Sequence, residues 1–120
     1  MTKRIMVVED NDLNRKLFCD VLKANGFEVE PVAEGHKVLD TARSVVPDLI
    51  IMDIQLGGIS GVDLIEAAKR DRRLSGIPVL AVTAFAAKGD EERIRAAGAE
   101  GYLAKPVSIG PFMSAVNALV

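Results

Sequence analysis

Short apolar runs alternate with amphipathic stretches along the whole chain, and this alternation limits the folds that the chain can adopt. The strand-like runs cover residues 5–9, 27–31, 48–53, 77–83 and 101–105. The helical stretches cover residues 13–25, 34–46, 62–71, 90–97 and the segment after Ser108. Strict alternation favours parallel strands joined by right-handed crossovers, with helices on both faces of one sheet. We therefore predict a single α/β domain over residues 1–120, a flavodoxin-like (βα)5 doubly wound sheet with strand order 2-1-3-4-5.

The ends of the predicted elements carry residues that usually start or stop them. The first helix stops at Gly26, and its apolar residues recur at helical spacing; they are Leu13, Leu17, Val21 and Leu22. Pro31 is expected to end the second strand, and Pro47 to close the second helix. Ser108 is expected to cap the last helix.

Composition excludes several classes of protein. Of the 120 residues, 49% are hydrophobic but only 4% are aromatic, which predicts an aliphatic core. A net charge of −2 argues against electrostatic binding of nucleic acid. Cys19 is the single cysteine, so neither an internal disulfide nor a cysteine metal site is expected. Because no apolar run approaches the roughly 18 residues of a membrane span, we expect a cytoplasmic protein without membrane insertion.

Polar residues whose side chains can bind a metal ion or take part in a reaction stand at the ends of four of the five apolar runs. Glu9 and Asp10 follow the first, Asp53 ends the third, Thr83 ends the fourth and Lys105 ends the fifth. Parallel strands point their carboxyl ends to the same edge of a sheet, and ligands of open α/β sheets bind at that edge. The predicted strand order places Asp53 one strand from the acidic pair and one strand from Thr83. The chain therefore predicts a site for a metal ion and a phosphoryl group.

The negative charges of three clustered carboxylates repel one another and must be neutralised by a positive charge. At 4 Å and an effective dielectric constant near 20, each pair of like charges costs about 4 kcal/mol. A hard divalent cation such as Mg²⁺, which prefers oxygen ligands, is a common remedy. In such a site Asp53 is the expected nucleophile, with Mg²⁺ held mainly by Asp10 and Asp53. Thr83 can donate its hydroxyl to a phosphoryl oxygen, and Lys105 can pair with the attached group.

These residues match a known family in order and spacing. The chain resembles a bacterial response-regulator receiver domain of the single-domain type over essentially its full length. The matching elements are Glu9-Asp10, Met52-Asp53, Thr83-Ala84 and Lys105-Pro106. The stretches 9–14 and 82–93 are similar to single-domain regulators of bacterial cell division. One departure is Gly57-Gly58 in the loop after Asp53, where many receivers carry a proline.

The resemblance implies a mechanism and partners. It implies phosphorylation of Asp53 by a sensor histidine kinase or histidine phosphotransferase, with Mg²⁺ bound by Glu9, Asp10, Asp53 and the backbone carbonyl of Gln55. It implies output to downstream signalling proteins through the fourth helix, fifth strand and fifth helix, in a monomer or weak dimer. We expect no enzymatic turnover beyond the chain's own phosphorylation and dephosphorylation.

The resemblance also assigns roles to individual residues. It implies a cis peptide between Lys105 and Pro106, and a switch in which Thr83 moves toward the phosphoryl group and Tyr102 turns inward. Gln55 and Phe85 flank the approach of the hydrolytic water. Since Phe85 offers no base and can obstruct water, we expect slow self-dephosphorylation.

Other readings of the same residues remain open. Glu9 and Asp10 could simply cap the first helix. A Mg²⁺-dependent phosphatase with an aspartate nucleophile is the main alternative, although Gln55 stands where that chemistry usually wants a second acid. A nucleotide or flavin binder would need a glycine-rich phosphate loop, which residues 9–13 lack. A transcription factor's receiver half would need a DNA-binding domain after residue 120, which we do not expect.

Overall fold

Five parallel strands form one sheet in the order β2-β1-β3-β4-β5, as predicted. The computed structural model describes residues 2–84 and 89–120. The strands are β1 (Arg4–Val8), β2 (Glu28–Val32), β3 (Leu49–Asp53), β4 (Val79–Thr83) and β5 (Gly101–Ala104). The helices are α1 (Asp12–Ala24), the 3-10 helix η1 (Gly35–Lys37), α2 (Val38–Val45), α3 (Gly61–Arg70), α4 (Asp90–Ala97) and α5 (Ile109–Leu119). Within the described ranges, no helix is both long and apolar enough to cross a membrane.

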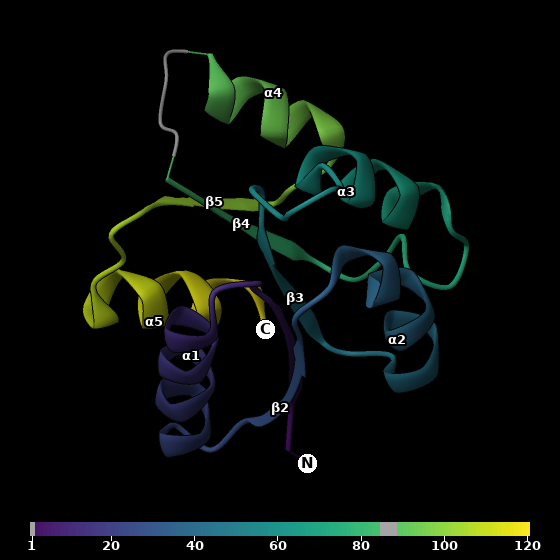
Figure 1. The fold of residues 1–120 in the computed structure, drawn as a ribbon. Helices are drawn as coiled ribbons and strands as arrows, with labels where there is room; N and C mark the ends of the chain where they lie inside the picture. Colours follow the sequence, from purple (N-terminus) through teal and green to yellow (C-terminus); the bar gives the residue numbers. More distant parts are fainter. Residues whose placement is uncertain (1, 85–88) are drawn as a thin grey trace.

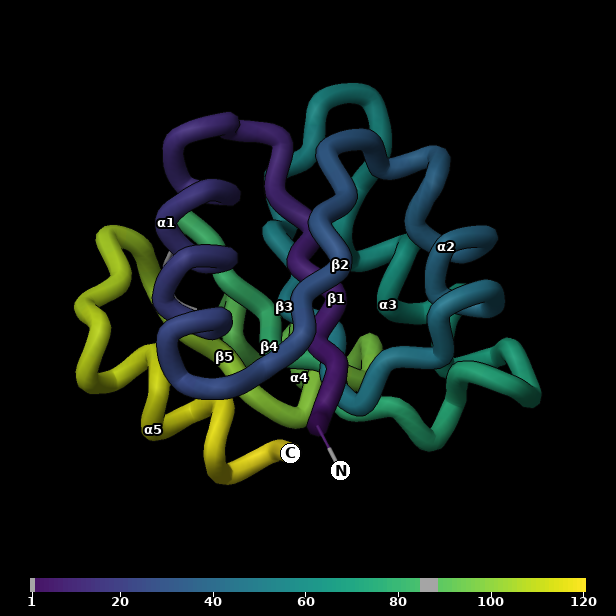
Figure 2. Tube along the Cα trace, turned by 90° about the horizontal axis from the view of Figure 1, so that it is seen from below, coloured from purple at the N-terminus to yellow at the C-terminus, as the bar shows by residue number. Residues whose placement is uncertain are grey.

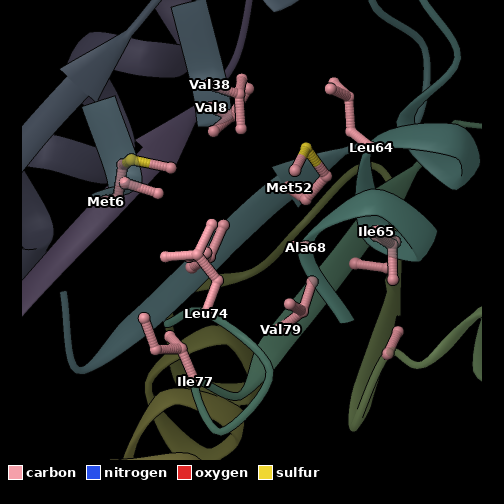
Figure 3. Close-up of a cluster of buried hydrophobic side chains, with 14 of the residues drawn as sticks. Met6, Val8, Val38, Met52, Leu64, Ile65, Ala68, Leu74, Ile77 and Val79 are labelled. Carbon is pink, nitrogen blue, oxygen red and sulfur yellow. The ribbon is translucent and has the colours of Figure 1, made fainter. Parts of the chain in front are cut away.

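Helices α1 and α5 cover one face of the sheet, and α2, α3 and α4 cover the other (Figure 1, Figure 2). Successive side chains of a strand point to opposite faces, so each strand feeds both layers. On the α1/α5 face, Phe18 stacks on Phe112 with ring centroids 5.0 Å apart. On the other face, Met6 and Met52 meet side chains from α3 and the segment before β4 (Figure 3). The central strands β3 and β4 are buried at every residue, as expected of strands covered on both faces.

The predicted boundaries are correct to within about two residues except at the start of the second helix, and the role predicted for Pro31 in the second strand is wrong. Pro31 was expected to end that strand, but it lies within β2 and pairs with Val7 of β1. Strand β2 is an edge strand, where a proline can be accommodated because its missing N–H can face away from the sheet. The second predicted helix is divided, because η1 precedes α2.

Only part of the predicted apolar set on α1 is buried. Leu22 is buried and Val21 is half-buried against the same cluster, whereas Leu13 is 76% and Leu17 is 46% exposed. Phe18 and Cys19, which the prediction did not include, are buried as well. Helical periodicity is compatible with either face, so it could not decide which one is buried. The face with Phe18 is buried because it meets Phe112 of α5.

The helix caps also correct the predictions. The N-cap of α1 is Asn11, whose side chain accepts a hydrogen bond from the Asn14 N–H, so neither Glu9 nor Asp10 caps this helix. Ser108 occupies the N-cap position of α5, as predicted, but its side chain makes no capping hydrogen bond.

Candidate functional site

The carboxyl ends of the strands bring the predicted residues to one edge of the sheet. Strand β1 pairs with β3 through Val8 and Met52, so the residues that follow them are neighbours. Strand β3 pairs with β4 through Asp53 and Val82. Lys105 follows the end of β5, and its N–H donates to the Thr83 carbonyl at 2.8 Å. The strand order therefore gathers residues that lie up to 96 positions apart in the chain.

Three carboxylates form the acidic part of the site. Glu9, Asp10 and Asp53 each offer an oxygen, and these oxygens lie within 4.8 Å of one another. The three differ in environment, because Glu9 and Asp53 are 1% and 2% exposed whereas Asp10 is exposed to solvent. Within residues 2–84 and 89–120, this is the only group of three such acids placed to hold a metal ion.

The positive charge of Lys105 partly neutralises the negative charges of the two buried carboxylates. Its Nζ lies 2.9 Å from Glu9 Oε2 and 3.2 Å from Asp53 Oδ2. Burial raises the pKa of Glu9, and the hydrogen bond from Lys105 opposes that rise only in part. Burial lowers the pKa of Lys105, but its hydrogen bond to Glu9 and the charges of both carboxylates outweigh this effect, so its net pKa is raised. Lys105 is therefore held as a cation inside the acidic cluster.

Main-chain N–H groups hold the carboxylates in place. The Gln55 N–H donates to Asp53 Oδ1 at 3.0 Å, and the Asn11 N–H donates to Glu9 Oε1 at 3.2 Å. The Gly57 N–H donates to Asp10 Oδ2 at 3.2 Å, so the loop with two glycines contacts the exposed acid directly. Each carboxylate thus accepts one of these bonds, and each keeps oxygen lone pairs for another partner.

Arg15 is a neighbour of the site that the sequence reasoning missed. Its Nη1 donates to the Glu9 carbonyl at 2.9 Å, and its Nη2 contacts Asp12 Oδ1 at 2.5 Å. The interaction fixes the backbone that precedes Asp10. Its position one turn into the helix that follows the acidic pair was the only signal in the sequence.

The remaining predicted residues take different places. Thr83 is buried at the end of β4, and Tyr102 is half-buried on β5 and packs against the core of the α2, α3 and α4 face. The Gln55 side chain accepts a hydrogen bond from the Ala84 N–H at 3.3 Å. The peptide bond between Lys105 and Pro106 is cis. Phe85 lies outside the described residues.

The donor set suits a hard cation. Carboxylate oxygens are the ligands that Mg²⁺ prefers, and the solvent-exposed side of the cluster at Asp10 leaves room for water ligands. Lys105 already compensates Glu9 and Asp53, so an added cation would chiefly serve Asp10 and the free oxygen positions of Asp53. The residues present therefore fit an Mg²⁺ site.

Comparison with known proteins agrees with this fold and identifies the family. The family model of the response regulator receiver domain matches residues 5–117. The chain is 51% identical over 117 residues to the polar-differentiation response regulator DivK of Brucella ovis, covering 98% of this chain and 95% of that protein. Its fold resembles the chemotaxis protein CheY4 of Vibrio cholerae, with a TM-score of 0.93, 23% identity and complete coverage of both chains.

A further solved structure carries a metal ion. It is the receiver domain of sensor histidine kinase PA1611 from Pseudomonas aeruginosa, with magnesium ion coordinated in its active site cleft. It has a TM-score of 0.90 and 28% identity, and the match covers 99% of this chain and 98% of that one. By the family model and by the relative of 51% identity, this chain belongs to the response regulator receiver domain family.

Proposed function

We propose that this protein is a single-domain response regulator that accepts a phosphoryl group on Asp53 and changes its binding to partner proteins as a result. The donor would be a phosphohistidine of a sensor histidine kinase or of a histidine phosphotransferase. The observation that carries the proposal is the Asp53 carboxylate, which ends a fully buried strand and is only 2% exposed. Burial of an ionised acid costs free energy unless the charge is paired, and buried acids of this kind are found preferentially at functional sites.

The proposed transfer step is a displacement at phosphorus. An Asp53 carboxylate oxygen forms a bond to phosphorus, while the bond between phosphorus and the imidazole nitrogen of the donor breaks. The electron pair of that bond stays on the nitrogen. Because the other ring nitrogen of the donor carries a proton, the step leaves a neutral histidine and an aspartyl phosphate. Lys105, at 3.2 Å from Asp53, can shift its donors to the phosphoryl oxygens as their charge enters the site.

Asp10, Asp53 and Glu9, with the backbone carbonyl of Gln55, would hold Mg²⁺. When bound, the ion would neutralise charge on the transferring phosphoryl group. The fit of the oxygen cluster to a hard cation supports this assignment. The Gly57 N–H bond would keep the exposed Asp10 carboxylate near the other two.

The conformational response is assigned to Thr83 and Tyr102. Thr83 would donate its hydroxyl to a phosphoryl oxygen, and Tyr102 would then turn further into the space beside β4. Their neighbouring strands support this coupling, because Tyr102 pairs with Ala81 only two residues before Thr83. The surface of α4, β5 and α5 would present the change to downstream signalling proteins. The likeness to a polar-differentiation regulator supports a role in bacterial cell-cycle or division signalling.

The proposal limits catalysis to the chain's own phosphorylation and dephosphorylation. A Mg²⁺-dependent aspartyl-phosphate phosphatase on the same fold is the alternative. That reaction wants a general acid near Asp53, but Gln55 has no titrating proton and its side-chain oxygen is engaged by Ala84. The proposal also includes slow hydrolysis of the acyl phosphate, in a cytoplasmic protein that is a monomer or a weak dimer.

Intact-mass measurement tests the proposed function. The purified protein is incubated with acetyl phosphate, with and without Mg²⁺, beside the variants Asp53→Ala and Asp20→Ala. Asp20 is a matched control because it is an exposed aspartate on α1. We expect wild type and Asp20→Ala to gain the mass of one phosphoryl group in Mg²⁺ only, and Asp53→Ala to gain none. Equal uptake by Asp53→Ala would reject the assignment, and sustained turnover of acetyl phosphate or a small phosphate ester would favour the phosphatase.

A further inference from the structure

The hydrogen-bond ladder between β3 and β4 opens beside the site. Its last rung joins the Ile54 N–H to the Val82 carbonyl at 3.0 Å. In the same register, the next rung would join the Ala84 N–H to the Ile54 carbonyl. That carbonyl instead accepts from the Gly61 N–H at 3.1 Å, because the chain turns back at the start of α3. The Ala84 N–H is left without its regular partner in the sheet.

The Gln55 side chain takes the place of the missing rung. Its Oε1 accepts the Ala84 N–H at 3.3 Å, so a side chain rather than a strand holds the residue that follows Thr83. A glutamine side chain has three rotatable bonds between Cα and its amide group, so it is far easier to displace than a strand. The end of β4 is therefore secured by an interaction that can be released without unfolding the sheet.

Gln55 is also bonded to the proposed phosphoacceptor. Its main-chain N–H donates to Asp53 Oδ1 at 3.0 Å. One residue thus contacts both the Asp53 carboxylate, at the end of β3, and the Ala84 main chain, directly after β4. A chemical change at the carboxylate acts directly on the residue that holds the end of β4.

The nitrogen of the Gln55 carboxamide, Nε2, is buried and has no hydrogen-bond partner among residues 2–84 and 89–120. Gln55 lines a cavity of about 520 Å³ together with Thr83, and that cavity extends to Asp90 and Arg93 of α4. An unsatisfied buried donor favours rearrangement of the side chain, because almost any position with an acceptor or water would be better for Nε2. The hydrogen bond from Ala84 to Oε1 therefore holds the side chain in place, whereas the unpartnered Nε2 favours its moving elsewhere.

We propose that Gln55 is a positioning residue whose side chain latches Ala84 in the unphosphorylated protein and releases it when Asp53 is phosphorylated. This inference rests on the proposed function. A phosphorylated carboxyl carries less charge on its carbonyl oxygen than a carboxylate does, so it accepts more weakly from the Gln55 N–H. Gln55 then relaxes, its side chain leaves Ala84, and the main chain at Ala84 can adopt its phosphorylated arrangement. The latch therefore stabilises the resting state.

Amide hydrogen exchange tests the latch in two variants. Gln55→Met keeps the length of the side chain but has no amide oxygen, whereas Gln55→Glu keeps an acceptor oxygen for Ala84. We expect the Ala84 amide to exchange about fivefold faster in Gln55→Met, the factor that corresponds to a net hydrogen bond of about 1 kcal/mol. Gln55→Glu should exchange at nearly the wild-type rate. The Lys105 amide, which donates to the Thr83 carbonyl, is the internal control and should not change.

Affinity for beryllofluoride with Mg²⁺ gives a second readout. Since the latch opposes the phosphorylated arrangement, Gln55→Met should bind this phosphoryl mimic about fivefold more tightly than wild type. Unchanged Ala84 exchange and unchanged affinity in Gln55→Met would overturn the latch. If Gln55→Met does not fold, Gln55→Asn, whose shorter side chain cannot reach Ala84, decides the question by the same criteria. Failure of the wild type to bind beryllofluoride would count against the proposed function, whereas the exchange result would still decide the latch.

Discussion

Lys105 donates a 2.9 Å hydrogen bond to the buried carboxylate of Glu9, a residue 96 positions earlier in the chain. The Glu9 side chain is 1% exposed and the Lys105 side chain 17% exposed, so water screens the pair little. The same ammonium group contacts Asp53. The first and last loops at this edge of the sheet are therefore joined by charge, and the acidic cluster is partly neutralised by the protein itself.

Replacement of Lys105 by methionine should destabilise the protein strongly. The substitution keeps most of the stem but leaves Glu9 and Asp53 buried without their cation. Removing one partner of a buried ion pair typically costs about 3–5 kcal/mol. We expect a loss of that size in urea unfolding with a chelator present, and partial recovery when Mg²⁺ supplies a positive charge.

Lys16→Met is the matched control for this prediction. Lys16 pairs with Asp20 on the exposed surface of α1, where water screens the charges. Its replacement should leave the urea midpoint nearly unchanged and insensitive to Mg²⁺. Equal effects of the two substitutions would show that the buried pair contributes little to stability.

Loss of the Thr83 hydroxyl should separate phosphorylation from the conformational response. Tyr102 is the only tyrosine and the chain has no tryptophan, so intrinsic fluorescence reports this residue alone. We expect Thr83→Ala to take up the phosphoryl group from acetyl phosphate. The Tyr102 fluorescence change should be smaller than in wild type. It should correspond to an equilibrium constant between the resting and phosphorylated conformations that is roughly tenfold less favourable, because one hydrogen bond to a charged group is lost.

Thr83→Ser distinguishes the hydroxyl from the shape of the side chain. It keeps the donor and should restore a wild-type fluorescence change on addition of Mg²⁺ and beryllofluoride. A full response in Thr83→Ala would remove the hydroxyl from the mechanism. A lost response in both variants would assign the effect to packing of the threonine methyl group.

Much of the fold and of the site follows from pattern alone, because the strict alternation of strands and helices leaves few topologies. The predicted strand order was confirmed, and it alone explains why Asp53 lies between Glu9 and Thr83. Lys105 was expected to reach back toward Asp53, and the two side chains are in contact. These relationships depend on where strands end, which apolar runs mark well.

Other features depend on loop conformation and on the choice between packing faces, which periodicity does not encode. The contacts of Gly57 with Asp10 and of Gln55 with Ala84 arise from the path of the loop between β3 and α3. The exposure of Leu13 depends on which face of α1 meets α5. The position of Pro31 within a strand is compatible only with an edge strand, so it could have been anticipated from the predicted order.

Gly61 should tolerate no side chain, although it lies at the start of a helix where alanine is usually favourable. A Cβ there would lie 2.6 Å from the Ile54 Cα and 2.8 Å from the Asp53 carbonyl oxygen. We expect Gly61→Ala to cost about 3 kcal/mol, the upper end of the range for overpacking. Both contacts are backbone, so relief would move the strand end that carries Asp53.

The same substitution at Gly110 should have a much smaller effect. Outside its chain neighbours and its own helix backbone, a Cβ at Gly110, the second residue of α5, meets no heavy atom within 4 Å. Gly110→Ala should therefore change the stability by less than about 1 kcal/mol, because the backbone entropy saved by replacing glycine is offset by the restriction that Pro111 places on the residue before it. Chemical denaturation of the two variants provides the comparison. Similar behaviour of Gly61→Ala and Gly110→Ala would contradict the close approach at Gly61.

Stability at acid pH should depend on the ion pair between α2 and the end of α3. Arg43 Nε lies 2.7 Å from Asp71 Oδ2, and the hydrogen bond from Arg43 lowers the pKa of Asp71 from its ordinary value of 3.8. A lowered pKa means that the pair stabilises the fold above about pH 3.8 and that this contribution disappears as the pH falls through the folded-state pKa. Asp71→Asn should therefore show a shallower loss of stability than wild type below that pH.

Asp40→Asn is the matched control for the acid titration. Asp40 contacts the same Arg43 at 3.1 Å, but its side chain is 90% exposed. Urea midpoints measured across the acid range should follow wild type in Asp40→Asn and diverge from it only in Asp71→Asn. Parallel curves for all three proteins would assign the acid sensitivity to other carboxylates.

Reductive trapping tests the central claim most directly, because it identifies the residue that carries the phosphoryl group. Borohydride reduces an acyl phosphate to a primary alcohol but leaves free carboxylates and phosphate esters unchanged, so peptide mass mapping locates the modified aspartate. After incubation with acetyl phosphate and Mg²⁺, we expect the alcohol at position 53 and nowhere else, and no product in the presence of a chelator. A trapped residue at Glu9 or Asp10, or a stable phosphate on a hydroxyl side chain, would contradict the account.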